Sequence, residues 1–283
     1  MKKSRDMRIT TRVALGLAGS AALLAGAGWL GLRVRREPFV PHSEKTPELD
    51  LAELPDGLPE PARRYFRVVF GEKVPRIETA VVWGRAGFKI MGVWTPMRFK
   101  GYYAEGRGFR RDMEITWFGA PVLRGTDAYL DGKGSLEITG LLNISGRGEN
   151  FDQGENLAMW GEAPFTTPSA PVLDPRIRWK PIDATSARLI VPFREAEESL
   201  RVEFDQHTGL MKSVSGMRYR NQEETKTSWR GEFSDWRTIH GIKVPHRAVA
   251  AWEDEREPYG IFEIEGAEYN VDVSEKVPGT GPR

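Results

Sequence analysis

Residues 77–117 read IETAVVWGRAGFKIMGVWTPMRFKGYYAEGRGFRRDMEITW, and this stretch decides the fold class. Large side chains recur at every second position in three parts of it, residues 77–83, 88–94 and 109–117. A period of two is typical of β-strands that have one apolar face. The stretch therefore predicts three consecutive strands.

The same period continues beyond this stretch, in residues 187–193, 200–204, 225–233, 242–252 and 262–264. Turn signals separate the segments, such as Asp131-Gly132, His240-Gly241 and Glu257-Pro258. About a dozen strands without regular helices between them predict an antiparallel meander. The predicted fold is mainly β, with a large curved antiparallel sheet or incomplete barrel and a small helical cover.

Two helices are predicted around this sheet. Residues 59–71 begin with prolines, end at Gly71 and place apolar side chains at helical spacing. Asp152–Pro164 opens with a capping-type Asp and stops at a proline, and one more turn is expected near Ala170–Leu173. We expect the second helix to cover the open side of the curled sheet.

Val13–Leu32 has 20 residues without a charge, which as a helix would span roughly 30 Å, the thickness of the hydrocarbon layer of a bilayer. Five bases precede it and three follow closely. By the positive-inside rule the N-terminus is cytoplasmic and the rest of the chain is outside. The stretch predicts an uncleaved signal-anchor in the cell membrane. A secretory signal cleaved at Ala25-Gly26-Ala27 is the alternative.

The sequence thus predicts five segments: a basic cytoplasmic segment (1–12), a transmembrane anchor (13–32), a proline-rich linker (33–58), a β-rich extracytoplasmic domain (59–275) and a disordered tail (276–283). Prolines favour an extended linker. The linker either holds the domain away from the membrane or packs against the domain.

Composition excludes several classes of protein. The first 36 residues hold eight bases and one acid, which leaves 33 bases against 39 acids for the remainder, so the folded part lacks the basic excess of a nucleic-acid binder. The chain has no cysteine, which excludes disulfides, Cys-ligated zinc and thiol nucleophiles. The four histidines show no metal-binding spacing, and no nucleophile or nucleotide motif occurs. We expect no metal, no cofactor and no catalytic residue.

Eight tryptophans lie outside the anchor. Aromatic residues that share the face of the apolar strand residues would line the concave side, as a filled core or as the wall of a cavity for a lipid. Glu162 follows Trp160 on the predicted cover helix and is either a rim carboxylate or a surface residue. The candidate ligand-binding residues are Trp83, Trp94, Met113, Trp117, Trp160 and Glu162.

Three functions stay open from these observations. The leading hypothesis is a membrane-tethered extracytoplasmic module that binds an apolar ligand, such as a lipid or acyl chain, without covalent chemistry. The second is a structural or protein-interaction component of the cell envelope, with a filled core. The third is an unrecognised hydrolase that uses carboxylates such as Asp112, Asp127 or Glu162, for which two carboxyl groups in one cleft would be the sign.

Several motifs resemble those of an uncharacterised bacterial family of membrane-anchored, β-rich proteins. They include the Leu-Pro-x-Pro-x-Arg-Arg-Tyr phrase at residues 58–65, TDAYLDGKG at 126–134 and GEAPF at 161–165. The resemblance covers roughly residues 58–272 and implies no activity. In fold alone, residues 200–214 and 241–245 are similar to carriers of the LolA/LolB lipoprotein-localisation type, which are incomplete barrels with helices on the concave side. Fold likeness by itself does not imply function.

Overall fold

The computed structural model describes Ser20, residues 26–220 and residues 223–280. Most of the predicted anchor lies outside these residues, and within it residues 26–31 are helical. In the described ranges, no helix combines the length and the apolar character needed to cross a bilayer. The uncleaved anchor and the cleaved signal both stay predictions.

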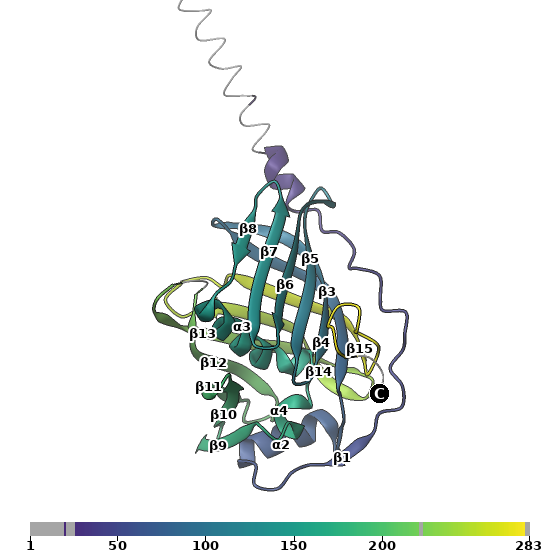
Figure 1. The fold of residues 1–283 in the computed structure, drawn as a ribbon, viewed down its shortest axis with the longest axis vertical. Helices are drawn as coiled ribbons and strands as arrows, with labels where there is room; N and C mark the ends of the chain where they lie inside the picture. The colour runs from purple at the N-terminus through teal and green to yellow at the C-terminus, as the bar shows by residue number, and fades with distance from the viewer. Residues whose placement is uncertain (1–19, 21–25, 221–222, 281–283) are drawn as a thin grey trace, which may run out of the picture.

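The domain is built on one antiparallel sheet of thirteen strands, so the prediction of a large curved antiparallel sheet is confirmed (Figure 1). The spatial order is β8-β7-β6-β5-β4-β3-β15-β14-β13-β12-β11-β10-β9, and two meanders therefore meet where β3 pairs with β15. We call β3–β8 the first half of the sheet and β9–β15 the second half.

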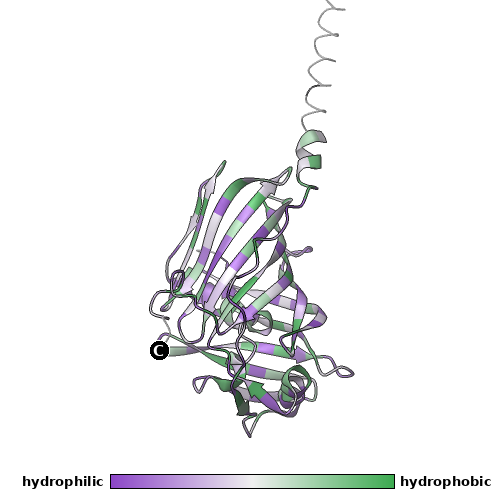
Figure 2. Ribbon diagram, turned by 90° about the vertical axis from the view of Figure 1, so that its right-hand side faces the viewer, coloured by the Kyte–Doolittle hydropathy of each residue, from purple (hydrophilic) through white to green (hydrophobic). Residues whose placement is uncertain are grey.

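The first half comprises β3 (Thr79–Ile90), β4 (Val93–Ala104), β5 (Gly108–Trp117), β6 (Ala120–Leu130), β7 (Lys133–Gly140) and β8 (Ile144–Gly146). The second half comprises β9 (Arg178–Asp183), β10 (Ser186–Phe193), β11 (Ala196–Phe204), β12 (Met211–Tyr219), β13 (Lys226–Ile239), β14 (Ile242–Trp252) and β15 (Gly260–Tyr269). Hydrophobic and hydrophilic residues alternate along many of these strands (Figure 2), as a sheet with one core-facing side requires.

Helix α3 (Glu149–Glu162) packs against the sheet on its concave side and contacts strands of both halves. It begins three residues before the predicted cap, Asp152, whose carboxylate instead accepts hydrogen bonds from the Gly134 amide (2.7 Å) and from Arg194 (2.8 Å). The Asp152 side chain therefore does not cap α3 and instead binds the amide of Gly134 on β7. Helix η1 (Ala163–Phe165) follows, and α4 (Ala170–Leu173) occupies the expected turn.

Helix α2 (Glu60–Phe70) fits the prediction and ends at Gly71, whose φ is 86°. Its apolar face, with Tyr65 and Phe66 at 2% and 1% exposure, packs against the second half of the sheet. The ring of Tyr65 lies 5.5 Å from that of Phe204, and the ring of Phe66 lies 5.8 Å from that of Trp179. This end of the concave face is filled with aromatic side chains.

The linker is extended and packs along the outside of the sheet, which is the second of the two predicted arrangements (Figure 1). Arg35 pairs with Glu263 at 2.7 Å, and Thr46 donates to the Glu268 carboxylate at 2.6 Å. Burial alone would raise the pKa of Glu268, but hydrogen bonds from Thr46 and Lys45 lower it to about 2. Near its end, β1 (Leu51–Glu53) pairs with β2 (Lys73–Pro75).

The C-terminal segment differs from the predicted disordered tail. Val271, Val273 and Val277 are buried against the outer face of the sheet, and Lys276 pairs with Asp112 at 2.8 Å. The described residues from 276 to 280 therefore belong to the folded domain.

Candidate functional site

A cavity of about 480 Å³ lies between the sheet and α3. Its walls are mainly apolar side chains from the first half of the sheet, from α3 and from β13 to β15. The largest of these are Phe88, Met97, Met113, Ile115, Leu123, Leu136, Ile138, Phe151, Trp229, Trp252, Tyr259 and Phe262. A volume of this size, with a few polar groups among apolar ones, is typical of small-molecule sites.

Small residues lie where α3 and β6 border this space. Ala158 presents only a methyl group to the cavity. Gly154 and Gly125 also line the cavity, but a Cβ atom there would lie 3.1 Å from the Tyr219 carbonyl oxygen or 3.0 Å from Ile138, so the two glycines allow close packing of α3 on β12 and of β6 on β7. The helix itself lies close to the sheet, because a Cβ atom on Gly146 would meet the Phe151 ring at 2.7 Å.

Five ionisable side chains form a cluster on one part of the cavity wall. Arg111 on β5 is 4% exposed and pairs with Glu162 of α3 and, at 3.6 Å, with Asp127 of β6. Arg218 on β12 lies 3.6 Å from Glu155 of α3. We call Arg111, Asp127, Glu155, Glu162 and Arg218 the charged cluster.

The two arginines also stack on aromatic rings. The Arg111 guanidinium lies 5.2 Å from the ring centroids of Phe109 and Phe262, and Arg218 lies 5.2 Å from that of Trp229. The Nε atoms of both arginines are buried without a hydrogen-bond partner within the described protein. The two guanidinium groups are therefore held mainly by ion pairs and ring contacts.

Burial raises the pKa of all three carboxyl groups of the cluster. The shift is greatest for Glu155, where the neighbouring Asp127 adds to the effect of burial. Burial likewise raises the pKa of Asp127 and of Glu162, although Arg111 opposes both shifts. The charged cluster thus holds three carboxyl groups and two arginines, so it has no excess of positively charged groups.

The structure brings two of the six candidate residues into the cavity wall, Met113 and Glu162. Trp160 is buried in the core beside them, at 4% exposure. Of the three carboxylates weighed for hydrolysis, Asp127 and Glu162 line the cavity, whereas Asp112 lies on the outer face and pairs with Lys276.

The remaining three tryptophans differ from their expected positions. Trp83 belongs to a separate cluster on the outer face, where the C-terminal valines cover it. The Trp94 ring lies over Gly87, where a Cβ atom would be 3.4 Å from the ring. Trp94 does not line the cavity. On β5 the alternation shifts at an irregularity between Ile115 and Thr116, and Trp117 stands 41% exposed at the strand end.

Sequence reasoning missed the role of Arg111, Arg218 and Glu155. A signal existed for Arg111, because it occupies a core-facing position between Phe109 and Met113. A charged residue in an apolar register needs a buried partner. Glu155 and Arg218 are far apart in the sequence, and no local pattern indicates that they meet.

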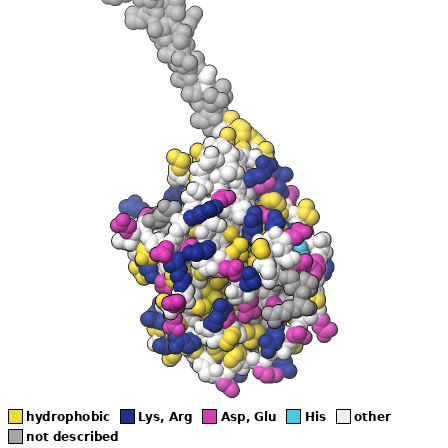
Figure 3. All heavy atoms as spheres, viewed as in Figure 1, with side chains coloured by type: hydrophobic (Ala, Val, Ile, Leu, Met, Phe, Trp, Pro, Cys, Tyr) yellow, Lys and Arg dark blue, Asp and Glu magenta, His cyan; other side chains and the backbone are white. Residues whose placement is uncertain are grey.

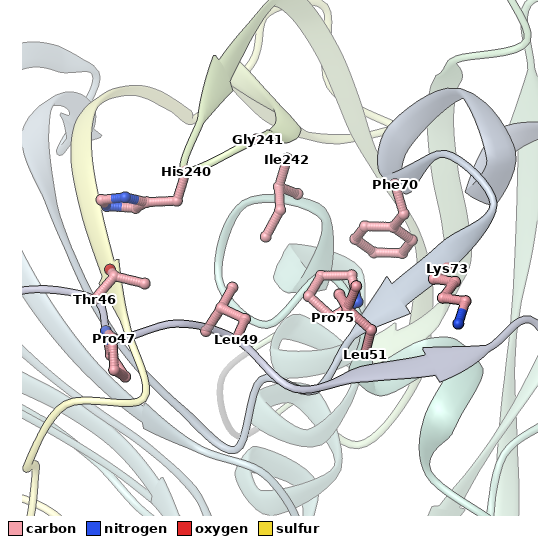
Figure 4. A pocket seen from close by; sticks show the side chains of 10 residues that line it. All are labelled: Thr46, Pro47, Leu49, Leu51, Phe70, Lys73, Pro75, His240, Gly241 and Ile242. Atoms are coloured by element: carbon pink, nitrogen blue, oxygen red, sulfur yellow. The ribbon is translucent and has the colours of Figure 1, made fainter.

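A second hollow of about 470 Å³ lies on the other side of the domain, as an open groove between the linker, α2 and the β13–β14 turn (Figure 4). Leu49, Leu51, Phe70 and Ile242 point into it, with His240 at one end. It has no cluster of buried ionisable groups, so the cavity under α3 is the stronger candidate site. Across the described residues, no group of three or more His, Asp or Glu side chains is arranged to hold a metal ion.

Solved structures resemble this fold only distantly. A DUF1329 family protein from Desulfovibrio piger ATCC 29098 matches with a TM-score of 0.41 and 11% identity, over 71% of this chain and 89% of that one. A LolA superfamily protein from Nitrosomonas europaea matches with a TM-score of 0.45 and 8% identity, over 76% and 94%. The second of these proteins belongs to the carrier type that the sequence resembles in fold, and at these values the matches say nothing about a ligand.

No curated protein matches the chain. Residues 48–264, well over half of the sequence, match one family, and this range includes the motifs at residues 58–65, 126–134 and 161–165. The chain belongs to this family, a family of unknown function (DUF6544).

Proposed function

We propose that the protein is an extracytoplasmic binding module, tethered to the cell membrane by residues 13–32, that holds an apolar molecule such as a lipid or acyl chain without changing it covalently. The observation that carries this proposal is the apolar cavity of about 480 Å³ under α3. A purely structural envelope protein has no need of such a space, because empty apolar volume destabilises a fold.

The charged cluster supports a ligand with a neutral polar end. The two arginines of the cluster already face three carboxyl groups, so a carboxylate or phosphate beside it would bring an uncompensated charge into a buried site. A hydroxyl, ester or amide group brings no charge and avoids this cost. A neutral acyl ester, with its chain along the apolar wall, fits both parts of the cavity.

Photocrosslinking tests the proposal on the full-length chain in phospholipid vesicles. The probe is a monoacylglycerol that carries a diazirine in its acyl chain, and crosslinked peptides are identified by mass spectrometry. We expect crosslinks to β5 and α3, at peptides that contain Met113 and Ala158, and we expect Ala158→Phe to abolish them. Crosslinks confined to residues 13–32 in the unaltered chain would contradict the proposal.

A hydrolase is the second candidate, because Asp127, Glu155 and Glu162 converge in one cavity, which is the arrangement expected of a carboxylate enzyme. The same monoacylglycerol distinguishes the two functions. A binding module releases it intact, whereas a hydrolase adds water across the ester and yields free fatty acid and glycerol. Free acid that forms with the unaltered chain and not with Glu162→Gln would favour the enzyme.

A further inference from the structure

In the first half of the sheet, the turns at one end carry apolar residues and the turns at the opposite end carry charged residues. Consecutive antiparallel strands place the β3–β4, β5–β6 and β7–β8 turns at one end, and the β4–β5 and β6–β7 turns at the opposite end. The opposite end carries Glu105-Gly106-Arg107 and Asp131-Gly132. The first end carries Met91-Gly92, Phe118-Gly119 and Leu141-Leu142.

These three turns and the strand ends beside them expose large apolar side chains. Met91 is 88% exposed and Leu141 is 79% exposed. We define the apolar turn surface as Met91, Val93, Trp117, Phe118, Leu141, Leu142 and Ile144. Figure 3 shows hydrophobic side chains gathered at the end of the molecule where the N-terminal segment joins it. Exposed apolar side chains that cluster in this way mark interaction sites.

Two of these side chains also sit on strained backbone. Met91 and Phe118 both have a φ of 48°, in the left-handed region that costs free energy for a bulky side chain. Asp131, in the same kind of turn at the opposite end, has a φ of 47° and is the residue type that such turns favour. The chain therefore keeps Met and Phe at positions where Asn or Asp would be both more soluble and less strained.

Hydrogen bonds to the N-terminal segment indicate what covers the apolar turn surface. The Phe118 amide donates to the Gly31 carbonyl at 2.9 Å, and the Trp117 indole donates to the Gly28 carbonyl at 3.1 Å. Gly28 and Gly31, near the end of the uncharged stretch Val13–Leu32, therefore lie at the apolar turn surface, and Arg33, Arg35 and Arg36 follow in the sequence. An apolar stretch followed by bases, beside exposed aromatic and aliphatic side chains, matches the layers of a phospholipid bilayer and its headgroups.

We propose that the apolar turn surface docks into the phospholipid bilayer and holds the mouth of the cavity against it. Met91 and Ile144 belong both to this surface and to the lining of the cavity under α3, so the two are continuous. A ligand then passes between bilayer and cavity without crossing water. This passage rests on the proposed ligand binding, whereas the docking rests only on the proposed membrane tether at residues 13–32.

Single labelled cysteines test the docking, since the chain has no cysteine of its own. Met91→Cys and, as a matched turn at the opposite end, Asp131→Cys are labelled with the fluorophore NBD in the full-length chain. The chain is reconstituted in vesicles of phosphatidylcholine and phosphatidylglycerol. We expect emission at position 91 to shift to shorter wavelength and to be quenched by nitroxide-labelled lipids, with neither effect at position 131.

Two results would overturn the docking. Emission at position 91 that matches position 131 would place the turn in water. A shift to shorter wavelength without quenching by the lipid nitroxides would mean that protein surrounds the label, either the chain's own cavity or another protein molecule, and not lipid.

A double variant tests the consequence for the ligand. Phe118→Asn with Leu141→Asn removes two apolar side chains outside the cavity wall, and asparagine relieves the strain at position 118, so the melting temperature should not fall. We expect loss of the quenching at position 91 and several-fold slower crosslinking of the cavity by the diazirine monoacylglycerol supplied in vesicles. Unchanged transfer from vesicles would contradict the proposal.

The same probe supplied on serum albumin separates this proposal from the proposed function. Crosslinking from albumin should be equal in the double variant and in the unaltered chain, because the cavity wall is the same. A chain whose turns are quenched by lipid, but whose cavity accepts the probe from neither source, would refute the proposed function and leave the docking intact.

Discussion

The concave face of the sheet is filled at one end and hollow at the other. Beside α2, the rings of Tyr65, Phe66, Phe204 and Trp179 pack against one another at centroid distances of 5.1 to 6.4 Å. Beside α3, apolar side chains of the same kinds surround about 480 Å³. The helices differ as well, because α2 inserts aromatic rings whereas α3 presents the methyl group of Ala158 to the cavity.

The comparison shows that two helices pack differently on one sheet. Close packing at the α2 end stabilises the domain, since dispersion contacts and apolar burial both increase with packing. The α3 end lacks part of these contacts, because its side chains leave about 480 Å³ unfilled. Three measurements would break or sharpen this contrast.

Truncation of one large side chain at each end gives the largest expected effect. Phe66→Ala, at the filled end, should lower the free energy of unfolding by about 3–5 kcal/mol. Met113→Ala should cost about 2 kcal/mol or less, because the Met113 side chain already borders empty space and has fewer contacts to lose. Urea unfolding of the two variants measures both values, and equal losses would contradict the contrast.

Enlargement of one small residue at each end gives the next effect, and the filled end should again lose more stability. Ala62→Phe on α2 should destabilise the domain by about 1–3 kcal/mol through overpacking, since Ala62 is fully buried. Ala158→Phe on α3 should leave stability unchanged, because its ring enters the cavity, yet it should abolish crosslinking of the cavity. If Ala158→Phe unfolded the domain as readily as Ala62→Phe, the cavity would not be a usable space.

The smallest effect concerns the charged cluster at the hollow end. Burial raises the pKa of Glu155 well above 4.5, so the folded protein binds this proton more tightly than the unfolded chain does. The resulting stability is complete below the pKa of the unfolded chain and is lost as the pH rises through the folded pKa. Glu155→Gln should remove this contribution and flatten the decline of stability with pH, by at most about 1.4 kcal/mol per pH unit.

Urea unfolding between about pH 5 and pH 8 measures this slope in both proteins. The raised pKa values of Asp127 and Glu162 act in the same direction, so the variant should retain part of the decline. Glu195→Gln, at an exposed turn position, is the control and should leave the slope unchanged. A slope that Glu155→Gln leaves equally unchanged would show that Glu155 is not the proton-binding group.

Most of the fold was predictable from the sequence, and only part of the site was. Apolar side chains at every second position predicted the strands, and prolines and a glycine predicted α2 and the turn at α4. These signals act between neighbouring residues, so they can be recognised in the sequence. Met113 and Glu162 were found in the same way. Arg218 and Glu155 escaped, because residues 63 positions apart meet only through the packing of α3 on the second half of the sheet.

The sequence alone determined that this protein is a mainly antiparallel β domain with few helices, because side-chain alternation and turn residues act over neighbouring positions. Only the tertiary structure decided which aromatic residues face inward and where the concave face is hollow. An irregularity in one strand, as after Ile115, changes which side chains share a face. The volume left under α3 is the difference between the curvature of the sheet and the side chains that fill it, and those side chains come from strands far apart in the sequence.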